Sequence, residues 1–144
     1  MQKELLLKNY YNVKSTIDLL VYSINKFPHE NEICNPLKPE IAEYFDSLSF
    51  RFEKSVEMLL SLFRTIELYL FALNSKTLRE LLLKMEKLEL ISSSEDLFEA
   101  RGLRNIITHT YEENDIFEIY SKILKYGKVI IRDFDRIKSF INEL

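Results

Sequence analysis

Residues 40–74 read EIAEYFDSLSFRFEKSVEMLLSLFRTIELYLFALN, and this stretch decides the fold class. It contains neither Gly nor Pro, and its apolar residues recur at helical spacing. They are Ile41, Tyr44, Phe45, Leu48, Phe52, Val56, Leu59, Phe63, Ile66, Leu70 and Leu73. This spacing predicts one long amphipathic helix from about Glu40 to Asn74. Its last turns, with Tyr69, Leu70 and Phe71 in succession, are apolar on more than one face, so we expect the core or a partner chain to cover them.

Similar patterns predict helices on both sides of this stretch. Apolar residues at helical spacing indicate a first helix over residues 3–27, which Pro28 ends. All three prolines lie between positions 28 and 39, and the residue before a proline disfavours the helical region, so we expect a loop there. A third helix is expected from about Lys76 to Ile91.

Capping signals predict where the remaining helices begin. Ser92 and Glu95 fit a capping box, with Ser92 as the N-cap of a fourth helix. Thr110 or Asn114 offers the start of a fifth helix that continues nearly to the C-terminus. Gly127 lies inside this last helix, where it costs about 1 kcal/mol relative to Ala, which a helix of such length can absorb.

Composition supports a helical fold and excludes several others. The 144 residues include only two glycines and three prolines, too few for the many turns of a sandwich or barrel. The chain is 47% hydrophobic and 30% charged, which excludes disorder, and no uninterrupted apolar stretch approaches the roughly 18 residues that a membrane span needs. We therefore expect a single all-α domain over residues 1–144, an up-and-down antiparallel bundle of about five helices.

Charge and cysteine content limit the partners and the compartment. The formal net charge of -3 provides no general basic field for nucleic acid, so any such contact must be local. The first residues resemble neither a signal peptide nor a transit peptide. The single cysteine, Cys34, cannot form an internal disulfide. These features favour a cytoplasmic protein that has no membrane partner.

Polar side chains that could take part in catalysis or binding are concentrated in residues 101–111, RGLRNIITHTY. On a helix, Arg101, Arg104, Asn105, Thr108 and His109 fall within an arc of about 140°. Ala100, Leu103, Ile106 and Ile107 are expected on the opposite, buried side. An imidazole is suited to proton transfer near neutrality, and a guanidinium about one and a half turns away can hold a phosphoryl oxygen. An ordinary solvated face, or cations capping a helix end, would give the same spacing.

Two stretches resemble those of a known family. Residues 104–111 are similar to the R-N-x-x-x-H-x-Y signature of HEPN-domain proteins, in the HepT-like branch that accompanies minimal nucleotidyltransferases. Upstream, Asp46 and Ser47, then Arg51, Phe52 and Glu53, then Glu57 resemble the D-S-x-x-x-R-F-E-x-x-x-E run of that branch. The resemblance covers about residues 46–126, with the two motifs in the family's order and separation.

This resemblance implies a homodimer in which the motifs of two chains meet and cut RNA, not DNA, without a metal ion or other cofactor. His109 would transfer protons, Arg104 would clamp the phosphate and Asn105 would orient the substrate. Gly102 would allow close approach of helices at the dimer interface. The partner nucleotidyltransferase, acting as antitoxin, would transfer AMP to Tyr111 and silence the nuclease.

A second interpretation is a non-catalytic subunit that docks on a minimal nucleotidyltransferase. Residues 95–118 hold seven acidic side chains against Arg101 and Arg104, and this acidic collar disfavours binding of an RNA backbone. The intact Arg104 and His109 favour the nuclease instead. A helical scaffold without either activity is a third interpretation.

Basic residues on the last helix offer a surface for RNA. Lys122, Lys125, Lys128, Arg132 and Arg136 fall within an arc of about 120°, opposite an apolar stripe, and could track a phosphate backbone. Arg101 is a further possible RNA-binding residue. An ordinary solvated face has the same appearance. Two separated histidines and one cysteine give no tetrahedral metal site, and there is no Gly-rich phosphate loop.

Overall fold

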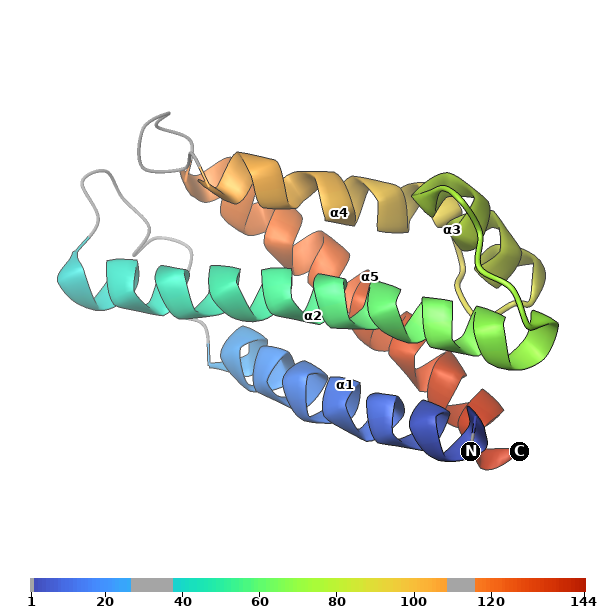
Figure 1. Ribbon diagram of the computed structural model, residues 1–144. Coiled ribbons are helices and arrows are strands. Elements are labelled where there is room, and N and C mark those ends of the chain that lie inside the picture. The colour runs from blue at the N-terminus through green and yellow to red at the C-terminus, as the bar shows by residue number, and fades with distance from the viewer. Residues whose placement is uncertain (1, 27–37, 109–115) are drawn as a thin grey trace.

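The computed structural model describes residues 2–26, 38–108 and 116–144, and it contains five α-helices with no strand in those ranges (Figure 1). The helices are α1 (Gln2–Asn25), α2 (Pro39–Phe71), α3 (Leu78–Lys87), α4 (Ser94–Thr108) and α5 (Ile116–Asn142). The all-α prediction is therefore confirmed. None of these helices combines the length and the apolar character that crossing a membrane requires, over the residues described.

The four longer helices form an antiparallel bundle. In Figure 1, α2 runs opposite to α1, α4 runs opposite to α2, and α5 returns from the end of α4 to bring the C-terminus close to the N-terminus. The short α3 lies at the end where α2 stops and α4 starts. The α2 helix contacts each of the other four, which explains why its sequence pattern decides the fold.

The core is made of the helical stripes that the spacing predicts. The α2 helix contributes Phe52 and Phe63, both with no exposed surface, and α1 contributes an i, i+3, i+4 stripe that begins at Leu6. The Tyr10 ring of α1 stacks on the Phe134 ring of α5, with centroids 5.2 Å apart and planes at 8°. Stacked rings at this spacing stabilise the packing beyond the area they bury. The predicted apolar stripe of α5 is buried from Ile119 onward.

Two helices stop earlier than the sequence predicts, and each stops without glycine. The α2 helix ends at Phe71, and its C-cap, Ala72, has a φ of 56° and donates its N–H to the Leu68 carbonyl at 2.9 Å. The α3 helix ends where Glu89 has a φ of 61°, and the Leu90 N–H bonds the Met85 carbonyl at 3.0 Å. These are left-handed C-caps, which usually carry Gly. Leu90 is nevertheless buried, as part of the α3–α4 connection.

The start of α4 also differs from the prediction. The N-cap is Ser93, not Ser92, because the Ser93 hydroxyl accepts the N–H of Asp96 at 3.1 Å. Ser92 instead donates both its N–H and its hydroxyl to Oδ1 of Asp133, each at 3.2 Å. These bonds fasten the α3–α4 connection to α5. The alternative starts of the fifth helix, Thr110 and Asn114, lie outside the described residues, and α5 is described from Ile116.

Gly127 has a packing role that the sequence did not indicate. A Cβ at this position would lie 3.0 Å from Cδ1 of Ile24 on α1. The absence of a side chain therefore allows α5 to approach the C-terminal end of α1 closely.

The described part of the chain leaves the C-terminal end of α2 partly exposed, although the sequence predicts that the core or a partner chain covers it. Leu70 and Phe71 are 38% and 44% exposed, and Leu73 just beyond the helix is 48% exposed. Only one face of these turns packs on the core. Coverage by a partner chain stays a prediction.

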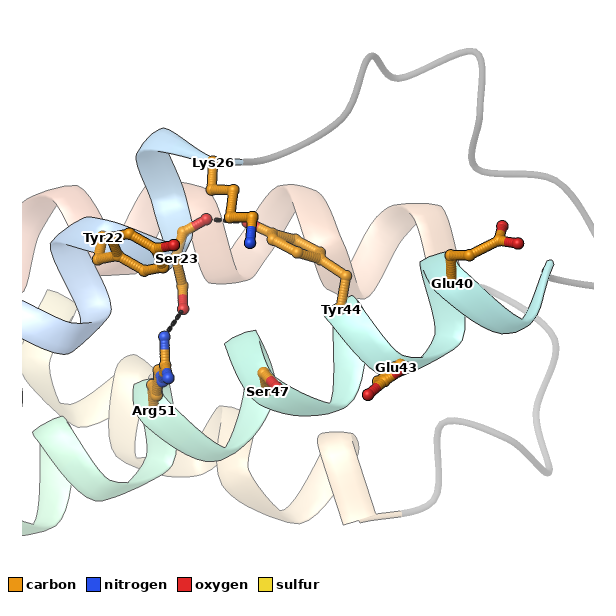
Figure 2. A pocket seen from close by; sticks show the side chains of 8 residues that line it. All are labelled: Tyr22, Ser23, Lys26, Glu40, Glu43, Tyr44, Ser47 and Arg51. Atoms are coloured by element: carbon orange, nitrogen blue, oxygen red, sulfur yellow. Dashed lines mark hydrogen bonds between the residues drawn. The ribbon is translucent and has the colours of Figure 1, made fainter.

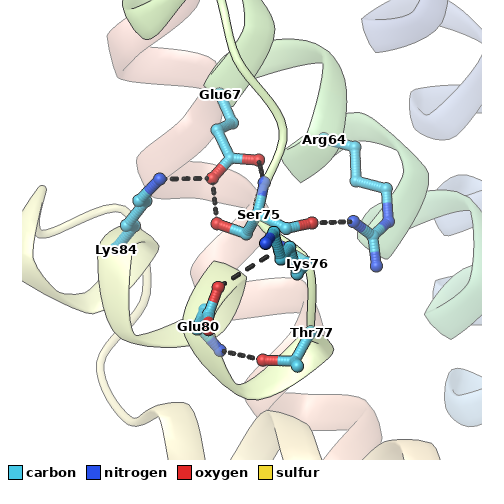
Figure 3. A network of polar contacts seen from close by, with 7 residues as sticks. All are labelled: Arg64, Glu67, Ser75, Lys76, Thr77, Glu80 and Lys84. Carbon is cyan, nitrogen blue, oxygen red and sulfur yellow. Dashed lines mark hydrogen bonds and ion pairs between the residues drawn. The ribbon is translucent and has the colours of Figure 1, made fainter.

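A buried carboxylate ties α2 to the loop before α3 (Figure 3). Glu67 has no exposed surface; it accepts the Ser75 N–H at 2.7 Å and Nζ of Lys84 at 2.9 Å, and it also accepts the Ser75 hydroxyl. Burial by itself raises the pKa of Glu67, but the bonds from Ser75 and Lys84 outweigh it and hold the pKa below its ordinary value. Arg64 donates to the Ser75 carbonyl at 3.5 Å. This network fixes the loop that borders the site described next.

Candidate functional site

The structure brings the two motif stretches into contact. Arg104 of α4 donates to the carboxylate of Glu57 on α2 and forms an ion pair with it. The Arg104 side chain is 35% exposed and the Glu57 side chain 45%, so the pair lies at the surface between the two helices. The first motif residue of α4 and the last motif residue of α2 therefore share one site.

Glu53, one turn before Glu57 on α2, belongs to the same site. It is half-buried, and burial raises the pKa of its carboxyl, an effect that the charge of Glu57 reinforces and that of Arg104 opposes. The Arg104 guanidinium thus forms an ion pair with Glu57 and also opposes the rise in the pKa of Glu53. This part of the site combines one cation with two acids.

An open cavity of about 320 Å³ extends from this ion pair along α2 and α4. Arg64, Arg101 and Arg104 line it together with Glu57, and Ser61, Leu60 and Leu78 complete the lining. On α2 the polar lining residues follow i, i+4, i+7 spacing, which places them on one helix face. Three guanidinium groups from two helices thus border one cavity.

The remaining residues of the predicted active site are placed only in part. Asn105 is exposed on α4. His109 and Tyr111 lie outside the described residues, as do His29 and Cys34.

The predicted buried side of α4 is partly wrong. Ala100 and Leu103 are buried and Ile107 packs against the core, but Ile106 is 46% exposed. The core stripe therefore follows steps of three and four that lead to Ile107. Nothing lies within 4 Å of a Cβ built on Gly102, so no packing within the described chain requires a glycine there.

The basic residues of α5 do not join the arginine cavity. Lys122 lines a separate cavity of about 190 Å³ on the other flank of α4, with Gly102, Ile106 and Tyr126 among its lining residues, and pairs with Glu118 at 3.3 Å. Of the other predicted RNA-binding residues, Lys125, Lys128 and Arg132 are all exposed. Lys125 lies 5.1 Å from the Tyr126 ring centroid, and Arg132 donates to the Ser92 hydroxyl at 2.8 Å. Of the predicted RNA-binding residues, Arg101 therefore lines the arginine cavity and Lys122 lines a different one, and their role in RNA binding stays a prediction.

The upstream motif also divides between two places. Ser47 and Arg51 line a cavity of about 350 Å³ between the end of α1 and the start of α2 (Figure 2). Arg51 donates to the Ser23 hydroxyl at 2.7 Å, and the Tyr44 hydroxyl donates to the Ser23 carbonyl. Burial raises the pKa of Tyr44 to about 12, although the charge of Arg51 opposes that shift. Glu53 and Glu57 face α4 instead.

Sequence reasoning missed Arg64 as a site residue. It belongs to neither motif, and only the packing of α4 on α2 brings it to the cavity of Arg101 and Arg104. Its spacing of i+7 from Glu57 was the available signal, since it shares the helix face of a motif residue. Among the described residues, no group of three or more His, Cys, Asp and Glu side chains is arranged to hold a metal ion.

Comparison with known proteins does not identify a family. No family model matches the chain, and neither the curated proteins nor the solved structures provide a match.

Proposed function

We propose that the chain is a metal-independent endoribonuclease of the HEPN type, the toxin of a pair whose antitoxin is a minimal nucleotidyltransferase. The observation that supports this most is the ion pair of Glu57 with Arg104. It joins the two stretches on which the family resemblance rests, although 47 residues of chain separate them. Motif residues that meet at an open, arginine-lined cavity favour a shared site over two unrelated matches.

The chemistry assigned to the site is transesterification of the RNA backbone. A base removes the proton of a 2′-hydroxyl, whose oxygen attacks the adjacent phosphorus. The bond from phosphorus to the 5′-oxygen then breaks, and an acid protonates that oxygen. His109 and its counterpart in a second chain are the proposed base and acid. Arg104 stabilises the charge that develops on the phosphoryl oxygens, and Asn105 orients the substrate.

Regulation by the partner enzyme is part of the same proposal. Tyr111 is the proposed acceptor of AMP, whose phosphodiester would add a negative charge that competes with the RNA phosphate for the guanidinium of Arg104. Mass spectrometry after incubation with the partner and ATP tests this step. Modification of other residues alone, or silencing that persists in Tyr111→Phe, would contradict it.

End-group analysis tests the nuclease activity. The protein should cut RNA in EDTA and leave 2′,3′-cyclic phosphate and 5′-hydroxyl ends. His109→Ala should lower the cleavage rate on the order of 100-fold or more. Full activity in His109→Ala, or loss of activity in EDTA, would exclude this mechanism.

The second candidate, a non-catalytic subunit that docks on a minimal nucleotidyltransferase, has one specific observation in its favour. The carboxylate of Glu57 already occupies the guanidinium of Arg104, and a paired arginine is less available to a phosphate. Tight binding to the nucleotidyltransferase without any RNA cleavage would favour this candidate.

A further inference from the structure

The arginine cavity carries more positive charge than its own lining balances. Three arginines face one glutamate there, in a protein whose formal net charge is -3. Like charges that line a common space repel one another, and an anion bound among them relieves this repulsion. The excess positive charge is therefore local to this cavity.

Two of the three guanidiniums are available to a ligand. Arg101 has no hydrogen bond or ion pair with any residue in the described part of the chain, and it is half-buried on α4. Arg64 is exposed, and the hydrogen bond that it donates to the Ser75 carbonyl is long, at 3.5 Å. Neither has a carboxylate partner within the described ranges, whereas Arg104 has Glu57.

The other residues that line the cavity suit an anionic ligand that also has an organic, partly apolar portion. Ser61 provides a hydroxyl beside the arginines, while Leu60 and Leu78 provide apolar surface. A phosphate has more acceptor oxygens than a carboxylate, and planar guanidiniums bind it through paired hydrogen bonds. A volume of about 320 Å³ lies within the range of small-ligand sites.

We infer that Arg64 and Arg101, together with Arg104, bind a phosphate group in this cavity. The phosphate is either part of an RNA backbone or free in solution. Glu57 limits the affinity, because its carboxylate repels the anion and occupies Arg104. The inference concerns binding alone, applies to both candidate functions, and therefore does not depend on cleavage.

Titration of the full chain tests the inference. The probes are inorganic phosphate, a 2′-O-methyl RNA oligonucleotide that cannot be cleaved, and acetate at equal ionic strength. The Nε–H signals of Arg64 and Arg101 in ¹⁵N NMR spectra should shift with phosphate and not with acetate. If the same substitutions weaken the binding of RNA and of phosphate, and RNA binds far more tightly than phosphate, the natural ligand is the RNA backbone. If they weaken only the binding of phosphate, the natural ligand is a free phosphate.

Variants supply the decisive comparison. Arg64→Ala and Arg101→Ala should each weaken phosphate binding about tenfold, as expected for a charged hydrogen bond. Arg64→Lys should have an intermediate effect, and Glu57→Gln should strengthen binding several-fold. Lys138→Ala, which removes one positive charge from an exposed position on α5, is the matched control and should bind normally.

Two results would overturn the inference. One is unchanged phosphate and RNA binding in Arg64→Ala and Arg101→Ala. The other is a weakening in Lys138→Ala as large as in those variants, which would mean that the effect follows total charge and not the cavity. If the unmodified protein binds phosphate as expected but does not cleave RNA, that result would count against the nuclease proposal only.

Discussion

The carboxylate of Glu57 on α2 and the guanidinium of Arg104 on α4 form an ion pair at the surface. Exposed pairs of this kind contribute only about 0–1 kcal/mol to folding. Its stabilising effect is therefore too small to explain why both residues occur in motif stretches. In the proposed nuclease, the pair would have the further role of positioning Arg104.

The two glycines should respond differently to substitution. In the single chain, Gly102→Ala places a methyl group in open space on α4 and should raise the free energy of unfolding of the monomer by about 1 kcal/mol, the usual difference in helix propensity. Gly127→Ala gains the same propensity but meets Cδ1 of Ile24 at 3.0 Å, so it should gain little or nothing. Urea unfolding of both variants measures the difference. An equal gain at both positions would contradict the close approach of α1 and α5.

The sequence predicts the helices better than it predicts their ends. Hydrophobic spacing identified α1, α2 and α5 because each buries one continuous stripe. The stops at Ala72 and Glu89 were missed because a left-handed C-cap without glycine leaves no compositional mark. Similarly, Ser92 and Ser93 are chemically equivalent as caps, and only the tertiary bonds to Asp133 separate their roles.

The sequence indicated candidate residues on α2 and on α4 separately, but it did not indicate which of them meet. Arg101, Arg104 and Asn105 follow from periodicity on α4. Arg64 lies on α2, where its i+7 spacing from Glu57 marks the helix face, but local spacing does not indicate which part of α4 packs on that face. Lys122, a predicted RNA-binding residue, lines a different cavity, between α4 and α5.

The buried pair of Glu67 and Lys84 should matter for stability. Lys84→Met should lower the free energy of unfolding at pH 7 by about 2 kcal/mol, less than for a fully buried pair because Lys84 is 36% exposed. The pKa of Glu67 is held below its ordinary value, so its contribution is present above that value and is lost as the pH falls through the lowered pKa. The deficit of Lys84→Met should therefore shrink in acid. A deficit that is independent of pH would contradict the assignment.

Asp133 should show the opposite dependence on pH. It has no exposed surface, and its Oδ2 has no hydrogen-bond partner among the described residues. Burial raises the pKa of Asp133, although the bonds from Ser92 oppose the shift. Ionisation therefore destabilises the fold as the pH rises through the raised pKa. Asp133→Asn should be more stable than the unmodified protein by about 1 kcal/mol at pH 7.

The advantage of Asp133→Asn should disappear near pH 3, where the native carboxyl is protonated in both folded and unfolded chains. Chemical unfolding at several pH values provides the measurement. An advantage that persists undiminished at pH 3 would mean that packing, and not charge, explains it.

A homodimer that uses the exposed face of α4 should be sensitive to Ile106. This side chain is 46% exposed and lines a cavity beside Gly102. Ile106→Glu would introduce a charge into such an interface, so the dimer should dissociate to a 17.2 kDa monomer with unchanged helix content. Light scattering and circular dichroism measure the two properties. An unmodified protein that is monomeric at micromolar concentration would contradict the shared-site model.

The most direct test of the account is the rate of RNA cleavage by Arg104→Ala, compared in EDTA with the unmodified protein and with Lys138→Ala. If Arg104 acts on the phosphoryl group, Arg104→Ala should cleave on the order of 100-fold more slowly, while its free energy of unfolding changes by less than about 1 kcal/mol. Lys138→Ala should cleave at the normal rate. Equal cleavage by Arg104→Ala and the unmodified protein, or no cleavage by the unmodified protein, would contradict the proposed nuclease.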